Sequence, residues 1–297
     1  MPGTRDRSAH QVRSAPSPDA VAAPTDHVDV AGSRIAYRSI GDGRPMILLN
    51  RMRGTLDTWD PRFLDLLARS HRVITVDFPG VGYSQGTLPP DMSIAASFVD
   101  AFATAIVVPR FVVAGWSWGG LVAQALLLEH AERVSHAILI GTNPPGENER
   151  PMQPAFLERA FKPVNDFEDD VVLFFEPKSA ASRTAAKASH DRIHARPDVA
   201  AKIPSTMDGI KAYIEAARGF REDAVGRRQR LTTTRTPILV VCGDNDTSTA
   251  GQNWFPLIGK MPNAHFVYFP ESGHGPQHQY PELTALHIDA FLRLAVD

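Results

Sequence analysis

Cysteine is nearly absent from this chain. Cys242 is the only one among 297 residues, so no disulfide can form within the chain. A metal site built on several thiolates is excluded for the same reason. Cys242 lies in the apolar run 237–243, where a small buried side chain is the expected role. A single thiol of this kind fits a reducing, cytoplasmic setting.

An excess of one charge and long apolar runs are also missing. Lys and Arg number 31 and Asp and Glu 33, for a formal net charge of −2. Nucleic-acid binding needs a concentrated positive face, so this balance predicts no nucleic-acid partner. No run of about 18 apolar residues occurs, which predicts no membrane-spanning helix. The expected partner is a small-molecule substrate, and a homodimer stays open.

Residues 1–26 have few apolar side chains. The segment is rich in Ala, Pro, Ser and Arg, and it lacks the apolar stretch that a secretory signal needs. Because so little of it can be buried, we predict that it is a disordered tail. The fold is expected to begin at residue 27.

Short apolar runs alternate with amphipathic stretches from there onward. Residues 26–30 and 34–38 flank Ala-Gly-Ser and predict a β-hairpin. Unbroken Val, Ile and Leu runs are typical of parallel strands covered on both faces. Such runs predict six more strands, at 45–50, 73–77, 111–115, 136–141, 237–243 and 265–269. Helical patterns separate them, at 59–71, 94–107, 121–132 and 281–296. The fold class is therefore α/β, with a doubly wound, mostly parallel sheet of eight strands.

One interval breaks this rhythm. Residues 141–237 contain no strand-like run, and their composition favours helices. A structureless loop of that length inside a compact domain is improbable. We expect a helical cap at 145–231, inserted between the sixth and seventh strands. Residues 27–144 and 232–297 then form the core.

The pattern Gly115-Trp-Ser-Trp-Gly119 directly follows one predicted strand and precedes a predicted helix. Gly-x-Ser-x-Gly in this context predicts a nucleophile elbow, which lifts the serine clear of the sheet. The glycines are needed because the tight turn leaves no room for side chains beside it. Ser117 is thus the candidate nucleophile.

A serine nucleophile needs a base, and the base needs a carboxylate to orient it. In this type of fold the order along the chain is serine, acid, histidine. Asp244 and Asp246 follow the predicted strand 237–243 and compete for the acid role. We favour Asp246, which lies deeper in the loop, and interpret Asp244 as a turn residue.

A histidine in the loop after the last predicted strand, His274, is the candidate base. Its loop and that of the aspartates lie at the sheet edge where open α/β folds bind ligands. His278, four residues on, is a rival that spacing does not exclude. His287 falls in the C-terminal helix pattern and is expected to be a packing or surface residue.

These motifs resemble the α/β-hydrolase superfamily, in the branch of capped esterases, haloperoxidase-like enzymes and C–C hydrolases. Besides the elbow, residues 77–84 match the Asp-x-Pro-Gly-x-Gly-x-Ser segment of that superfamily. Gly243-Asp-Asn-Asp246 and Glu271-Ser-Gly-His274 are similar to its acid and histidine loops. The similarity runs from about Val28 to the C-terminus.

One segment departs from the superfamily. Asn50-Arg51 stands where relatives usually have His-Gly. By resemblance, Met52 and Trp118 supply the two N–H groups of the oxyanion hole. Asn50 and Arg51 become candidate substrate-binding residues.

Two further side-chain types near the elbow have alternative roles. Trp116 can line a substrate pocket or pack against the sheet, and we count it among the candidate substrate-binding residues. Arg51 and Arg53 can reach a substrate, although a solvated surface arginine is the more common role.

The sequence predicts hydrolysis of a small carboxylic ester, lactone or related acyl compound through an acyl-enzyme. This chemistry needs neither a cofactor nor a metal. Alternatives with the same triad are a C–C bond hydrolase, a lyase or a perhydrolase, because fold does not decide the reaction. A small-molecule receptor with slow hydrolase activity is a second alternative.

Overall fold

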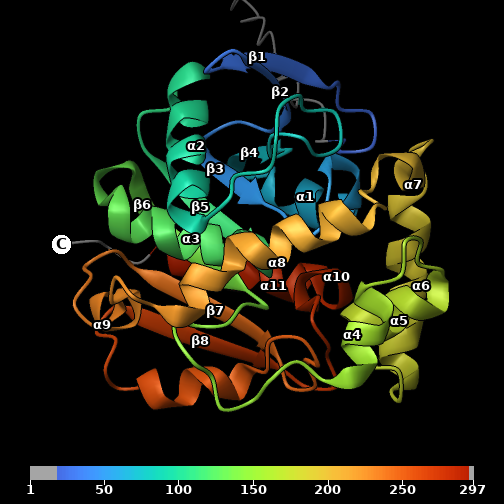
Figure 1. Ribbon diagram of the computed structural model, residues 1–297. Helices are drawn as coiled ribbons and strands as arrows, with labels where there is room; N and C mark the ends of the chain where they lie inside the picture. The colour runs from blue at the N-terminus through green and yellow to red at the C-terminus, as the bar shows by residue number, and fades with distance from the viewer. Residues whose placement is uncertain (1–18, 294–297) are drawn as a thin grey trace, which may run out of the picture.

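A single mixed sheet runs through the molecule, which we describe from a computed structural model for residues 19–293 (Figure 1). Its eight strands lie in the order β1-β2-β4-β3-β5-β6-β7-β8. Their bounds are β1 (Asp26–Val30), β2 (Ser33–Ile40), β3 (Arg44–Leu49), β4 (His71–Val76), β5 (Phe111–Trp116), β6 (Val134–Ile140), β7 (Ile238–Gly243) and β8 (Ala264–Phe269). β2 pairs antiparallel with β1 and β4, and every other pair is parallel. The predicted mostly parallel α/β sheet is confirmed.

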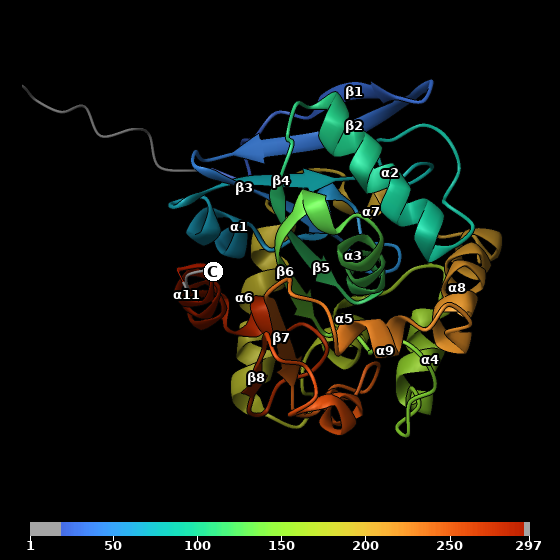
Figure 2. The same cartoon turned by 90° about the vertical axis from the view of Figure 1, so that its left-hand side faces the viewer.

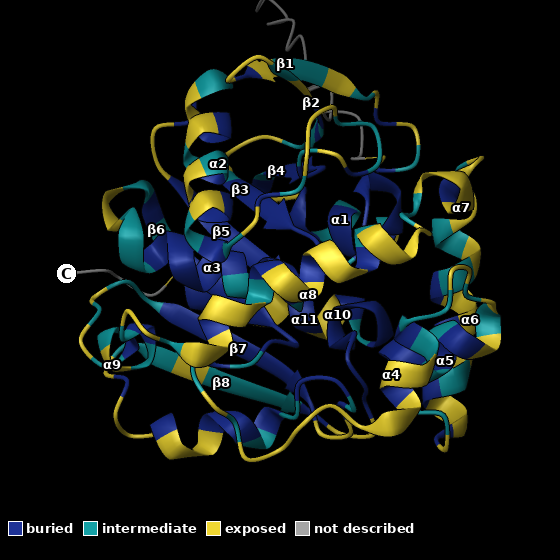
Figure 3. Cartoon of the chain, viewed as in Figure 1, coloured by how far each residue is buried: buried dark blue, intermediate teal, exposed yellow. Residues whose placement is uncertain are grey.

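Helices cover both faces of the sheet (Figure 2). α1 (Pro61–Leu67) and α11 (Pro281–Leu292) lie on one face, and α2 (Met92–Ala105) and α3 (Trp118–Glu129) lie on the other. Successive side chains of a strand point to opposite faces. Thus Met46 and Leu48 of β3 join the core cluster under α1, whereas Ile47 and Leu49 join the cluster under α3. Figure 3 shows the central strands buried beneath these layers.

Residues 145–231, which we call the cap segment, hold helices and no strand. They are α4 (Pro154–Ala160), α5 (Phe167–Phe174), α6 (Ala180–Ile193), α7 (Val199–Lys202), α8 (Met207–Glu222) and α9 (Arg227–Leu231). Local signals explain the starts of α5, α6 and α8, because Asp166, Ser179 and Thr206 each accept a backbone N–H bond as an N-cap. α8 buries Ile210 and Tyr213 and packs on α2 and α3. Figure 1 shows α4 to α7 grouped at one side of the sheet.

The folded chain begins earlier than the sequence predicts. Ala20 and Ala23 are buried, and the Ala20 N–H donates to Asp65 Oδ1 at 2.7 Å. Arg196 of the cap segment donates to the carbonyls of Ala20 and Ala23, at 3.1 and 2.9 Å. A disordered tail is therefore wrong for residues 19–26, because hydrogen bonds hold a stretch with little apolar surface. The rest of the predicted tail, residues 1–18, lies outside the described residues.

No helix within residues 19–293 combines the length and the apolar character needed to cross a membrane.

Candidate active site

Ser117 lies at a sharp turn between β5 and α3. Its φ of 57° and ψ of −117° are strained for a residue with a side chain, as expected for a serine held at an elbow. Close packing explains the glycines around it. A Cβ on Gly119 would lie 2.2 Å from the Leu49 carbonyl oxygen, and one on Gly115 would lie 2.3 Å from that of Gly119. Only glycine allows α3 to start so close to β3.

His274 meets Ser117 from the loop that follows β8. Its Nε2 lies 2.8 Å from Ser117 Oγ, and its Nδ1 lies 2.8 Å from Asp246 Oδ2. The Trp116 indole N–H donates to the His274 carbonyl at 2.7 Å, which fixes this loop over the elbow. The side chains of His274 and Asp246 are both buried, so the hydrogen bond between them is shielded from water.

Asp246 is held by several donors besides His274. Oδ1 accepts the N–H groups of Ser248 and Thr249, both at 2.8 Å, and Oδ2 accepts the Thr249 hydroxyl at 2.8 Å. Burial alone would raise the pKa of this carboxyl. The charge and hydrogen bond of His274, together with the Thr249 donors, outweigh burial and lower the pKa of Asp246. The carboxylate is therefore ionised beside the imidazole at neutral pH.

The other candidate acid and bases lie elsewhere. Asp244 is exposed and accepts the Ser272 N–H at 3.1 Å, as a turn residue does. His278 is buried, and its Nε2 accepts the Asp60 N–H at 3.2 Å. His287 is exposed on α11, with its ring 5.9 Å from that of Phe269. Of these candidates, the structure brings only Asp246 and His274 to Ser117.

Of the predicted oxyanion donors, Trp118 directly follows Ser117, and Met52 lines the same cavity as Ser117. Trp118 is the first residue of α3, where backbone N–H groups have no partner within the helix. Among residues 19–293, neither the Trp118 nor the Met52 backbone N–H donates a hydrogen bond. Both are thus available to a ligand, and their role in an oxyanion hole stays a prediction.

Asn50 does not contact the cavity, so its assignment as a substrate-binding residue is wrong. Its Nδ2 donates to the Thr55 carbonyl at 2.8 Å and to Thr58 Oγ1 at 2.9 Å. Its Oδ1 accepts the Arg51 N–H at 2.8 Å. With all its polar atoms occupied, the buried amide shapes the loop where relatives have His-Gly. A Cβ on Gly54 would lie 2.4 Å from Asn50 Cγ, so this glycine completes the arrangement.

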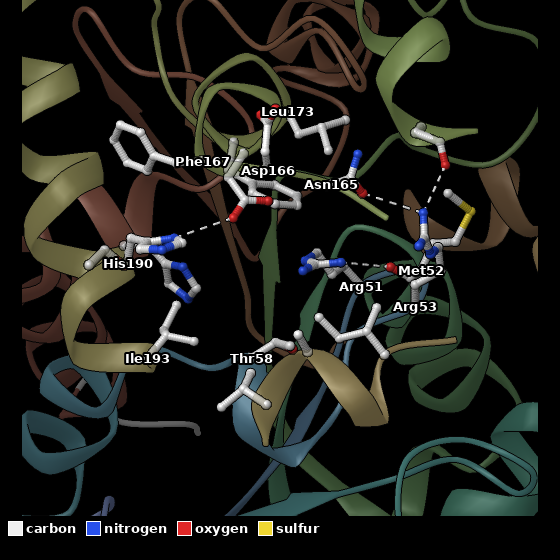
Figure 4. A pocket seen from close by; sticks show the side chains of 18 of the residues that line it. Arg51, Met52, Arg53, Thr58, Asn165, Asp166, Phe167, Leu173, His190 and Ile193 are labelled. Carbon is white, nitrogen blue, oxygen red and sulfur yellow. Dashed lines mark hydrogen bonds and ion pairs between the residues drawn. The ribbon is translucent and has the colours of Figure 1, made fainter. Parts of the chain in front are cut away.

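A cavity of about 280 Å³ opens in front of Ser117. Trp116 lines it and is also packed against Trp59 and Phe174, with ring centres 5.7 and 5.4 Å away, and its role in substrate binding stays a prediction. The cap segment supplies most of the other wall, which includes Phe156, Val164, Phe167, Leu173, Ile193 and Ile203. Figure 4 shows Phe167, Leu173 and Ile193 around the cavity.

Arg51 and Arg53 are not solvated surface residues. Arg53 is buried, and its guanidinium donates to the carbonyls of Ala160, Lys162, Pro163 and Pro204, at 3.3, 2.8, 2.6 and 2.6 Å. Arg51 lines the cavity, and burial lowers its pKa to about 10. Neither environment is readable from the sequence, because the acceptors of Arg53 lie more than a hundred residues away along the chain, and the aromatic rings beside Arg51 also belong to distant segments.

Sequence reasoning missed Thr249 and the acid–base pair of the cap segment. Thr249 donates a hydrogen bond to Asp246, and its place three residues after the aspartate is the one sequence feature that could have indicated this role. His190 Nδ1 lies 3.6 Å from Asp170 Oδ2 on the wall of the cavity, and both sit in a helical pattern without any motif. No group of three or more His, Cys, Asp or Glu side chains within residues 19–293 is arranged to hold a metal ion.

A serine at a strand–helix elbow of a mostly parallel sheet, hydrogen-bonded to a buried histidine, is the arrangement of an α/β-hydrolase active site. The sequence profile of the alpha/beta hydrolase fold family matches residues 44–281, and the chain belongs to this family.

Curated relatives include a pimeloyl-[acyl-carrier protein] methyl ester esterase of Nitrosomonas europaea. It is 26% identical over 86% of this chain and 98% of its own length. A 2-hydroxy-6-oxo-6-phenylhexa-2,4-dienoate hydrolase of Burkholderia cepacia is 24% identical over 89% of this chain and 90% of its own. An alpha/beta hydrolase fold protein from Chitinophaga pinensis superposes with a TM-score of 0.82 at 29% identity. That match covers 93% of this chain and 100% of the solved one.

Proposed function

We propose that this protein hydrolyses a small carboxylic ester, lactone or related acyl compound by serine catalysis. The proposal rests on one observation above all, the hydrogen-bonded series Ser117 Oγ–His274 Nε2 and His274 Nδ1–Asp246 Oδ2, both at 2.8 Å. Each contact is within the reach that general-base activation of a hydroxyl requires. Relatives named as ester and C–C hydrolases support the reaction class.

The proposed reaction has two halves. Ser117 Oγ attacks the carbonyl carbon while its proton passes to His274 Nε2, and the negative charge on the carbonyl oxygen is held by the Met52 and Trp118 N–H groups. The tetrahedral intermediate collapses, and His274 protonates the leaving alkoxide. Water then attacks the acyl-enzyme, His274 takes its proton, and the same proton returns to Ser117 as the acid is released. Asp246 keeps Nδ1 protonated and stabilises the imidazolium throughout.

The cap segment is proposed to enclose the substrate. Its apolar side chains form much of the wall that lines the cavity with Ser117, and Phe156 lies with its ring 5.5 Å from that of His274. An apolar enclosure with few polar groups is typical of small-molecule sites. A cytoplasmic location completes the proposal, supported by the lone, fully buried thiol of Cys242.

The test is Ser117→Ala, with Ser135→Ala on β6 as the control for a serine outside the cavity. We expect Ser117→Ala to fold and to lose turnover of p-nitrophenyl acetate by about 10⁴-fold or more. A fluorophosphonate probe should label wild type and Ser135→Ala, and should not label Ser117→Ala. Labelling of another residue, or an active Ser117→Ala protein, excludes the assignment.

A C–C hydrolase is the second candidate, because a relative of that name covers nearly the whole chain. It uses the same site, so only the substrate separates the two. Turnover of a vinylogous diketone at rates that exceed those of simple esters would favour it. A wild-type protein that binds esters but does not turn them over would instead favour a receptor.

A further inference from the structure

Arg51 places a positive charge inside the candidate active-site cavity. It follows β3 and lines the same cavity as Ser117. Figure 4 shows its guanidinium within the cavity, bonded to the Met52 carbonyl, at a distance of 2.9 Å. Two aromatic faces adjoin it, since the guanidinium carbon lies 4.3 Å from the Phe174 ring centre and 5.4 Å from that of Trp116.

This charge has no anionic partner in the described part of the chain. Arg51 forms no ion pair with a carboxylate of residues 19–293, and its Nε is buried without a hydrogen-bond partner. Burial lowers the pKa of Arg51 to about 10, so the group remains protonated at neutral pH. Aromatic faces compensate for only part of the desolvation of a cation. An anion that enters the cavity would therefore gain a strong, charge-assisted interaction.

The other charged side chains around the cavity already have partners. Arg53 is bonded to cap-segment carbonyls. Asp166 caps α5 by accepting the Asp169 N–H at 2.9 Å. Asp170 raises the pKa of Arg51 through its charge, and its Oδ2 lies 3.6 Å from His190 Nδ1. Arg51 is thus the cation to which a ligand anion can bind without displacing an existing partner.

Apolar side chains of the cap segment, among them Phe167, Leu173 and Ile193, line the cavity together with its polar groups, and they define the rest of the ligand. We infer that the substrate is an ester or lactone that carries a carboxylate at the far end of a short apolar span, and that Arg51 binds this carboxylate. The planar guanidinium can donate two parallel N–H bonds to it. This inference rests on the proposed function, because it assumes that Ser117 attacks the same molecule.

The test compares esters that differ only in charge. Monomethyl esters of straight-chain dicarboxylic acids, from succinic to suberic acid, are paired with methyl esters in which an amide replaces the free carboxylate. We expect wild type to prefer the best acid over its amide by roughly 10- to 100-fold in kcat/KM, the range for a hydrogen bond to a charged group. Arg51→Met keeps the length of the side chain without its charge and should bring the ratio near one. Arg51→Lys should retain part of the preference.

The ratio separates binding of a carboxylate from other roles of Arg51. If Arg51→Met slows the acid and the amide equally, Arg51 supports the oxyanion or the cap, and the inference is wrong. A wild-type ratio of one, or a preference that survives in Arg51→Met, also overturns it. Arg218→Met, an exposed cap arginine paired with Glu215, is the matched control and should keep the wild-type ratio.

A binding measurement keeps the inference independent of turnover. Calorimetry on Ser117→Ala should detect tighter binding of the acid than of the amide, and Ser117→Ala/Arg51→Met should lose that difference. Equal binding of the two esters to Ser117→Ala contradicts the carboxylate anchor. Failure of wild type to hydrolyse any ester, p-nitrophenyl acetate included, contradicts only the proposed function.

Discussion

Asp244 and Asp246 are two residues apart and have different surroundings. Asp246 is buried and accepts hydrogen bonds from two backbone N–H groups, a hydroxyl and the imidazole. Asp244 is exposed and accepts from Ser272 and from the Asn245 side chain, at 3.1 and 2.9 Å. A carboxylate that orients a catalytic imidazole has to be desolvated and fixed, and only the first environment meets that need.

Substitution of each aspartate by asparagine should separate the two. Asp246→Asn removes the charge that stabilises the imidazolium and disturbs the tautomer of His274. We expect it to lower kcat by about 10⁴ at neutral pH, as in a well-studied serine protease, while the fold is kept. Asp244→Asn should reduce kcat by less than about tenfold, because an amide oxygen can still accept the turn bond. Ester turnover by both variants, with circular dichroism as the folding control, checks this. A larger loss in Asp244→Asn would reverse the assignment.

Two arginines join the sheet core to the cap segment. Arg53, in the loop after β3, donates to the carbonyl of Lys162, which precedes α5, and to that of Pro204, which follows α7. Arg192, on α6, makes a bidentate ion pair with Asp60 next to α1, at 2.8 and 2.6 Å. Other polar contacts also join the core to this segment, among them Ser182 Oγ–Gln279 Oε1 at 2.6 Å and Arg227 Nη2–Glu129 Oε1 at 2.7 Å. Arg53 and Arg192 therefore contribute a share of what holds the cavity wall opposite Ser117.

Arg53→Met should loosen the cap segment without unfolding the sheet. The variant loses donors to four carbonyls, which water can satisfy only when this part of the segment moves outward. We expect amide hydrogen exchange at residues 160–165 and 203–206 to rise at least about tenfold, and KM for esters to rise with it.

The exchange of β5 and β6 serves as an internal reference for the same Arg53→Met sample. Arg218→Met is the control for an exposed arginine in the same segment. Unchanged exchange at 160–165 in Arg53→Met would show that the other contacts of the cap segment hold it without Arg53.

For the molecule as a whole, buried neutral histidines make stability depend on pH. Burial lowers the pKa of His278 from 6.5 to about 4, and its Nε2 must stay unprotonated to accept the Asp60 N–H. Since the folded pKa is the lower one, the contribution of His278 is complete above about pH 6.5 and is lost as the pH falls toward 4. His136, whose pKa burial also lowers to about 4, adds to the same trend.

His278→Gln should flatten this dependence. Glutamine can accept the Asp60 N–H and does not titrate. At this position the unfolded chain of the variant therefore no longer binds one proton more than the folded chain. Between pH 6.5 and 4 the free energy of unfolding should then fall less steeply in the variant than in wild type, and the two slopes should differ by about 1.4 kcal/mol per pH unit. Urea unfolding across this range measures the slope, and the same measurement at about pH 8 isolates the direct effect of the substitution. Equal slopes in the two proteins would show that His278 is not buried in the neutral form.

The sequence alone determined the elements and their order. Runs such as 111–115 and 237–243 are apolar throughout because both faces of a parallel strand are covered, and this local pattern is visible without a structure. The elbow is visible too, since Gly115 and Gly119 are required by backbone contacts within and next to one turn. Local geometry and chain order are thus sufficient to nominate Ser117 and a later acid and histidine.

Only the tertiary structure decided which groups meet. His278 is bonded to Asp60, 218 residues away, and the chain around it gives no sign of that contact. Asn50 turns inward to its own loop, Arg53 meets the cap segment, and residues 19–25 pack through hydrogen bonds from Arg196. Hydrophobic patterns record what is buried, but a polar side chain is satisfied by whichever donor or acceptor the folded chain brings near it. That pairing depends on contacts between distant segments, which the local sequence does not specify.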